Sequence, residues 1–159
     1  MTIHAAGRIA IVFALAVLVT AVVASIVQTQ INLAALTALG APVTLGIRLL
    51  TTLQDIALFG PVMAAITAAA FLPGFAAAGL ARRLVPLPPI AFYALAGVVA
   101  LGAAFLLMGF VTPMPTLVAA ARTQAGLLAL AATGALGGAL FAHLNRKRRP
   151  SSNLRYAAR

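Results

Sequence analysis

Acidic side chains are almost absent from this chain, since Asp55 is the only one among 159 residues. Charged residues of both signs make up 8% of the sequence, whereas 64% of it is hydrophobic. A water-soluble surface needs more charge than this, because such a chain would expose large apolar patches to water. The composition therefore excludes an ordinary soluble domain and predicts an integral membrane protein.

Cysteine is also absent, which excludes disulfides, thiolate metal sites and cysteine nucleophiles. A single acid excludes catalysis by paired carboxylates, and His4 and His143 have no further ligands nearby for a metal or a haem. The chain carries no phosphate-binding loop, nucleophile elbow or dinucleotide-binding motif. The sequence therefore favours a non-enzymatic protein without a cofactor or a metal.

What the chain does contain is four apolar blocks, each long enough to cross about 30 Å of hydrocarbon as a helix. The blocks cover residues 9–27, 56–80, 90–111 and 125–144. They predict an all-α, four-helix membrane bundle that forms a single domain over residues 1–149, followed by a basic, disordered tail over residues 150–159. A signal peptide is the alternative interpretation of the first block, although signal cores are usually only about 7–15 residues long. Proline at Gly60-Pro61 and at Pro73 predicts kinks in the second block.

The basic residues are sorted to one side of these blocks. With the N-terminus inside, nine of the eleven basic residues lie on the inner side, and only Arg48 and Arg122 lie outside. The positive-inside rule favours this arrangement, so both termini are predicted to be cytoplasmic. The preference for arginine over lysine and the many alanines indicate a bacterial inner membrane protein. Nucleic-acid binding is not expected despite the net charge of +10, because no basic surface with interleaved aromatic residues exists.

The stretch over residues 28–55 is apolar but too interrupted to predict a fifth crossing. It is interpreted as an outer amphipathic or re-entrant segment between the first two helices, with Pro42 in the first turn of its helix. Polar residues recur at helical spacing in this helix, opposite a row of leucines. The polar members are Thr44, Arg48, Thr51, Thr52 and Asp55. Other polar residues at the same level are Gln28, Gln30, Asn32, Thr123 and Gln124, and these would line a shallow outer pocket.

Arg48, Asp55 and Arg122 form the candidate site. Arg48 and Asp55 lie about 10.5 Å apart along one helix axis, which is too far for a direct pair, so Arg122 is the better partner for Asp55. Three interpretations stay open for the cluster. It is a structural ion pair at the membrane edge, a site for an anionic lipid or ligand, or a carboxylate that handles ions or protons in transport.

Small residues recur along each block, and the clearest case is Gly134-xxx-Gly138 in the fourth. This motif predicts a helix-packing face, either inside the bundle or against another protein. We therefore expect an accessory or scaffold protein that packs against itself or against other membrane proteins in the lipid bilayer. The basic residues 146–149 predict binding of anionic lipid at the cytoplasmic tail. The alternative is a small oligomeric transporter or channel, or an anionic-lipid-binding protein, that uses the arginine and aspartate cluster.

Overall fold

Nearly all of the described chain is helical. The computed structural model describes residues 3–111 and 118–146, and these contain no β-strand. The elements in chain order are α1 (Ile3–Ala38), α2 (Leu45–Leu58), α3 (Gly60–Ala81), α4 (Pro89–Val111), the short 3-10 helix η1 (Ala119–Arg122) and α5 (Gln124–Leu144). Helices α1, α3, α4 and α5 are long and apolar enough to cross a membrane. The predicted all-α bundle with four spans is therefore confirmed, and the protein is a multi-pass membrane protein.

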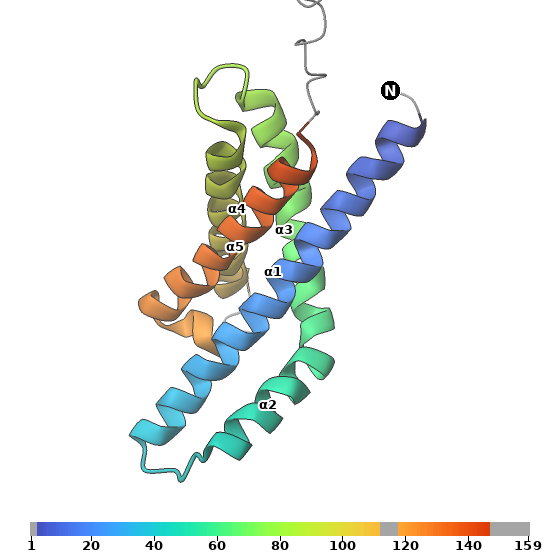
Figure 1. Cartoon of the computed structure of the whole chain (residues 1–159). Helices are drawn as coiled ribbons and strands as arrows, with labels where there is room; N and C mark the ends of the chain where they lie inside the picture. Colours follow the sequence, from blue (N-terminus) through green and yellow to red (C-terminus); the bar gives the residue numbers. More distant parts are fainter. Residues whose placement is uncertain (1–2, 112–117, 147–159) are drawn as a thin grey trace, which may run out of the picture.

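Helix α1 runs diagonally across the other long helices (Figure 1). Helices α4 and α5 form the most extensive helix pair, while α1 packs against α5 and α3, and α3 also packs against α4. Helix α2 folds back along α1, so that the two form a hairpin reaching beyond the ends of α4 and α5 (Figure 1). This hairpin contains the amphipathic segment that the sequence predicts between the first two spans.

The bounds of α4 and α5 agree within one residue with the spans predicted over residues 90–111 and 125–144. Pro73, which predicts a kink in the second span, lies inside α3. The predicted tail over residues 150–159 lies outside the described residues.

Helix α1 is longer than the first predicted span. The sequence predicts a span over residues 9–27, whereas the helix continues to Ala38. The helix continues through the polar residues of this extension, and two of them, Thr29 and Gln30, bond through their side chains to α2. Helix α1 ends at Ala38, and Gly40 follows with a φ of 86°, a left-handed conformation that glycine adopts without steric cost. The amides of Gly40 and Ala41 bond back to carbonyls of the last turn, as in a Schellman motif.

Helices α2 and α3 are separate, although the sequence predicts one kinked span over residues 56–80. Helix α3 begins at Gly60, with Pro61 in its first turn. The missing N–H of Pro61 costs no hydrogen bond there, because first-turn amides have no partner inside a helix. The start of α2 also differs from the prediction, since Thr44 caps the helix with its side chain and Pro42 precedes the cap. Gly60-Pro61 therefore marks a junction between helices.

An aromatic cluster joins the four long helices at one depth. Phe13 of α1, Phe75 of α3, Tyr93 of α4 and Phe141 of α5 meet there. The ring centroids of Phe75 and Phe141 lie 4.8 Å apart, and Phe71 stacks on Phe75 at 4.5 Å. Such ring pairs contribute about 0.5–1.5 kcal/mol each beyond the area they bury. The cluster therefore fixes the four helices relative to one another.

Glycines bring the backbones of α4 and α5 into direct contact. A Cβ added at Gly134 would overlap the carbonyl of Gly97, and one added at Gly138 would overlap the carbonyl of Tyr93. Lipid is as apolar as a helix surface, so close van der Waals packing of this kind is what holds membrane helices together. Gly134 and Gly138 are both buried, and the face they form is thus used within the chain, against α4.

Candidate functional site

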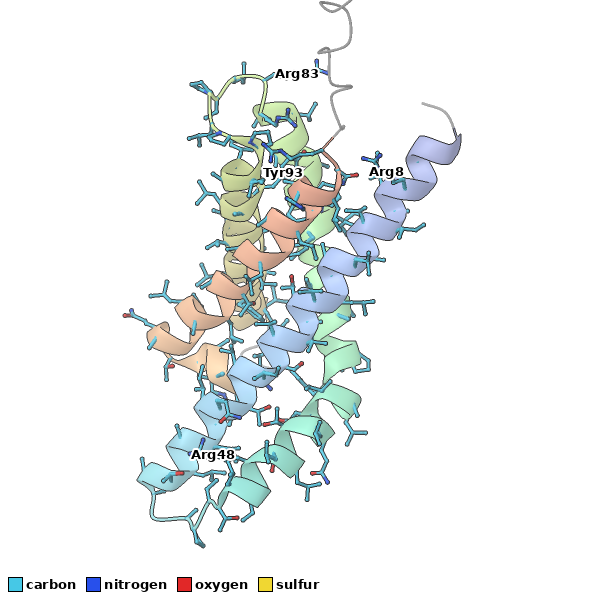
Figure 2. The ribbon with its side chains drawn as sticks, viewed as in Figure 1. Arg8, Arg48, Arg83 and Tyr93 are labelled. Carbon is cyan, nitrogen blue, oxygen red and sulfur yellow. The ribbon has the colours of Figure 1, made fainter. Side chains whose placement is uncertain are left out.

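Polar side chains gather in a seam between the two helices of the hairpin. The seam lies toward the end of the molecule that carries Arg48, whereas Arg8 and Arg83 lie at the opposite end (Figure 2). We call this group the hairpin seam. Its members are Thr29 and Gln30 on α1 and Arg48, Thr52 and Asp55 on α2.

One half of the hairpin seam is a chain of hydrogen bonds through Gln30. The Arg48 guanidinium donates from Nη1 to Gln30 Oε1 at 3.0 Å. The Gln30 amide nitrogen donates to Thr52 Oγ1 at 3.0 Å, and the Thr52 hydroxyl donates to the main-chain carbonyl of Arg48 at 2.7 Å. Both ends of the Gln30 amide are therefore used, and Arg48 is held against α1 by a neutral partner.

The other half of the hairpin seam is the contact between Thr29 and Asp55. Thr29 Oγ1 lies 2.6 Å from Asp55 Oδ2, and it also lies 2.8 Å from the main-chain carbonyl oxygen of Ser25, one turn earlier. Thr29 is fully buried and Asp55 is half-buried. Arg48 and Asp55 thus share one seam, and the bonds that place them there run to α1.

Two buried polar atoms lie next to the hairpin seam on α1. Ser25 is 1% exposed and Gln28 is 7% exposed, and among the described residues neither Ser25 Oγ nor Gln28 Oε1 has a hydrogen-bond partner. The position of a Cβ on Gly60 would lie 4.0 Å from both Ser25 Oγ and the main-chain oxygen of Asp55. Ser25 Oγ therefore points toward the α2–α3 junction, where Asp55 lies. Buried polar atoms normally have a partner, so these two atoms are hydrogen-bonding capacity that the described contacts leave unused.

The polarity of α2 is reversed relative to a helix on a soluble protein. Its polar face meets α1, while its leucines point away from the rest of the chain. Leu45, Leu49 and Leu53 are between 59% and 73% exposed, and no residue of α2 is buried. A soluble amphipathic helix would turn these leucines inward. The outer surface of the hairpin is therefore as apolar as that of a membrane helix.

Comparison with protein-family models, with curated proteins and with solved structures gives no match to this chain. No activity, ligand or partner is therefore carried over from a relative. The features that bear on function are the hairpin seam and two hollows on the surface of the bundle.

Arg122 lies in η1. This short helix packs against α5 and α1. Arg122, Thr123 and Gln124 line a hollow of about 270 Å³ together with α4, and the remaining lining residues are Leu106, Ala121, Leu127 and Leu128. Of the polar residues expected in a single outer pocket, Thr123 and Gln124 line this hollow, whereas Gln30 belongs to the hairpin seam. The ion pair between Asp55 and Arg122 stays a prediction.

A second hollow is an apolar groove between α3 and α4. Its volume is about 510 Å³. The lining residues are Ile66, Ala69, Ala70, Pro73, Gly74, Ala100, Ala103, Ala104, Leu107 and Met108. The two helices are in close contact at Gly74, where an added Cβ would lie 2.6 Å from the Cβ of Ala100. We call this hollow the α3–α4 groove.

Two parts of this geometry differ from what the sequence predicts. Gln28 and Gln30 were expected to share a pocket with the loop before α5, and no role was expected for Thr29. The partners of these residues come from α2, which is close only because α1 extends to Ala38. A polar run of Gln28-Thr29-Gln30 inside a continuous helix is the one signal that could have indicated a polar partner.

Proposed function

We propose that this protein is a non-enzymatic accessory or scaffold subunit of a membrane assembly, and that the α3–α4 groove receives a transmembrane helix of its partner. The observation that supports this is the groove itself, whose walls are made mainly of alanine and glycine. Small residues let two helix backbones approach closely, which is the main source of helix association in lipid. The partner is either another membrane protein or a second copy of this chain.

A backbone feature of α3 adds to the case for a protein partner. Pro73 has no N–H to give to the carbonyl of Ala69, one turn earlier, and both residues line the α3–α4 groove. In hydrocarbon, a carbonyl freed in this way has to be satisfied by a donor from a neighbouring helix or from its own chain. A partner helix with a serine or threonine at this depth would supply such a donor, whereas a lipid tail would not.

We further propose that the protein resides in a bacterial inner membrane with both termini in the cytoplasm. Arg8 and Arg83 lie at one end of the bundle and Arg48 at the other (Figure 2). Arg8 also donates to the main-chain carbonyl of Leu144 at 3.4 Å, which keeps the start of α1 next to the end of α5. The basic residues 146–149 follow directly, so the more basic end faces the side that carries anionic lipid.

Variants in the groove test the proposed function. Ala103→Leu fills the α3–α4 groove, and Ala132→Leu adds the same bulk on the exposed face of α5, outside it. Mild-detergent purification after crosslinking, followed by mass spectrometry, should recover a partner protein or a dimer with the parent chain and with Ala132→Leu. Ala103→Leu should lose it. Recovery that is equal for both variants, or a parent chain with no protein bound, would contradict the proposal.

The orientation is tested in a separate experiment. Because the chain has no cysteine, one introduced cysteine is its only thiol and reports the side on which it lies. A single cysteine at Leu84, in the exposed turn after α3, should react with a membrane-impermeant maleimide only in inverted vesicles. A cysteine at Leu39, at the tip of the hairpin, should react from the opposite side if it reacts at all. Labelling of Leu84→Cys in intact cells would reverse the proposed topology.

A further inference from the structure

We propose that Asp55 and Thr29 form an exchangeable proton-binding site in the hairpin seam, with the buried hydroxyl of Ser25 one turn before Thr29 on α1. The ligand is a proton taken from water, and the acceptor is Asp55 Oδ2. This inference goes beyond the proposed scaffold function and does not depend on it. It rests on the number of hydrogens available to Thr29, on the unpartnered polar atoms and on the charges around Asp55.

The Thr29 hydroxyl has one hydrogen but lies within hydrogen-bond distance of two acceptors. These are Asp55 Oδ2 at 2.6 Å and the main-chain oxygen of Ser25 at 2.8 Å. If Thr29 donates to Ser25, as threonines in membrane helices commonly donate to the preceding turn, the short contact needs a proton on Asp55. If Asp55 is ionised, Thr29 turns its hydrogen to the carboxylate instead. The hydroxyl therefore serves both protonation states of Asp55 by a rotation about one bond.

Ser25 supplies the second, independent observation. Ser25 is 1% exposed, its Oγ has no partner among the described residues, and that atom lies 4.0 Å from the position of a Cβ on Gly60, at the α2–α3 junction. An unpartnered hydroxyl can both donate and accept, so it suits a water that carries protons to a neighbouring carboxyl. Gln28, at 7% exposed, leaves an acceptor unpartnered one turn along the same helix. Two buried polar atoms of α1, Ser25 Oγ and Gln28 Oε1, are thus left without a hydrogen bond by the contacts among the described residues.

Few fixed charges stand near Asp55 to hold it in one state. The elements packed against α2 are α1 and α3, and between Ile9 and Ala81 the chain has no charged side chain other than Arg48 and Asp55 themselves. Arg48 is two turns away and bonds to Gln30. Arg122 lies on η1, which packs against α1.

Proton uptake at this site balances simply. One O–H bond forms at Asp55 Oδ2, one negative charge is lost, and the proton comes from water and returns to it. The new acid donates to Thr29 Oγ1, and Thr29 donates to the Ser25 carbonyl. The contact that joins α1 to α2 is therefore kept in both protonation states of Asp55.

Infrared difference spectroscopy can observe this proton directly, because Asp55 is the only side-chain carboxyl of the chain. Spectra of the full-length protein in liposomes are recorded as the pH is cycled. We expect a carboxylic-acid carbonyl band that shifts when the aspartate is carbon-13 labelled and disappears in Asp55→Asn. The labelled parent protein needs no substitution, so the result stands even if Asp55→Asn fails to fold. Absence of a label-sensitive acid band across the range in which the protein stays folded would overturn the proposal.

Variants of the partner residues and a change of salt complete the test. Thr29→Val keeps the shape of the side chain but can neither donate nor accept. It should change the response of the band to pH, because the carboxyl then loses its hydrogen-bond partner on α1. Thr37→Val, whose hydroxyl bonds only within α1, is the matched control and should leave the band unchanged. Equal titrations of the two variants would overturn the role of Thr29. Replacing choline by sodium should have no effect, and a titration displaced by sodium would instead assign the site to that ion.

Discussion

The direct backbone contact between α4 and α5 leads to a sharp prediction about three glycines. Gly97→Ala and Gly134→Ala should each destabilise the bundle, whereas Gly102→Ala should not. At the first two positions an added Cβ would overlap the main chain of the facing helix, and a main chain cannot turn aside as a side chain can. At Gly102 the added Cβ would lie 3.4 Å from the Cβ of Ala131, close to an ordinary contact. All three glycines lie inside helices, so replacing each of them by alanine changes the helix propensity by the same amount.

The magnitudes follow from two opposing effects. Replacing glycine by alanine inside a helix stabilises by about 0.5–1 kcal/mol. Overpacking a tight interface costs about 1–3 kcal/mol, and here the cost lies at the upper end because the two helices must separate along their length. Gly97→Ala and Gly134→Ala should therefore lose about 2 kcal/mol, while Gly102→Ala gains up to about 1 kcal/mol. A loss of this size is a large part of a typical stability of about 5–15 kcal/mol.

Purified variants in the same detergent can be compared by heating each to a series of temperatures and measuring what remains in the monodisperse gel-filtration peak. Gly97→Ala and Gly134→Ala should fail at clearly lower temperatures than the parent chain, and Gly102→Ala at the same or a higher one. The double variant of Gly97 and Gly134 should cost less than the sum of its parts, since the first methyl already separates the helices. If the three single variants melt together, the close approach of α4 and α5 is refuted.

Three further predictions concern other parts of the fold. Phe75→Ala should destabilise by about 3–5 kcal/mol because its ring is in the aromatic cluster, while Phe110→Ala, on an 89% exposed side chain, should be near neutral in the same heating assay. Gly40→Ala should cost about 1–2 kcal/mol in that assay through its left-handed φ, although nothing lies near its Cβ; no change would mean that α1 ends differently. A spin label at Leu49 should be accessible to oxygen and shielded from a water-soluble nickel chelate, with the reverse at Leu84, and equal exposure to the chelate would place α2 in water.

The sequence is most informative where structure depends on apolar length alone. Helices α4 and α5 follow from uninterrupted apolar runs, so their bounds are predicted within one residue. The Gly60-Pro61 pair shows where this fails: proline is tolerated in the first turn of a new helix and also kinks a continuous one, and local sequence does not distinguish the two cases. Gly134 and Gly138 likewise indicate a packing face without indicating which helix packs against it. Which helix occupies that face depends on contacts far apart in the sequence.

The candidate site was harder to predict because its bonds are not local. Arg48 and Asp55 are found by their helical spacing, but their partners, Gln30 and Thr29, are reached only when α1 continues past the predicted span and α2 folds back on it. Charge complementarity favours Arg122 as the partner of Asp55, which is the only acidic residue of the chain. In the structure, neutral hydroxyl and amide groups on α1 bond to Asp55 and Arg48, and such groups give no charge signal in a sequence.

The length of α1 and the reversed polarity of α2 together locate the hairpin. A helix of 36 residues is about 54 Å long at 1.5 Å per residue, so it would need a tilt of about 56° to stay within about 30 Å of hydrocarbon. That exceeds the usual range of about 0–40°. At about 40° the helix spans roughly 41 Å, which matches the bilayer with its headgroup regions, about 40–45 Å. The tip of the hairpin then lies among headgroups, where its outward leucines meet lipid and the seam residues remain within reach of water.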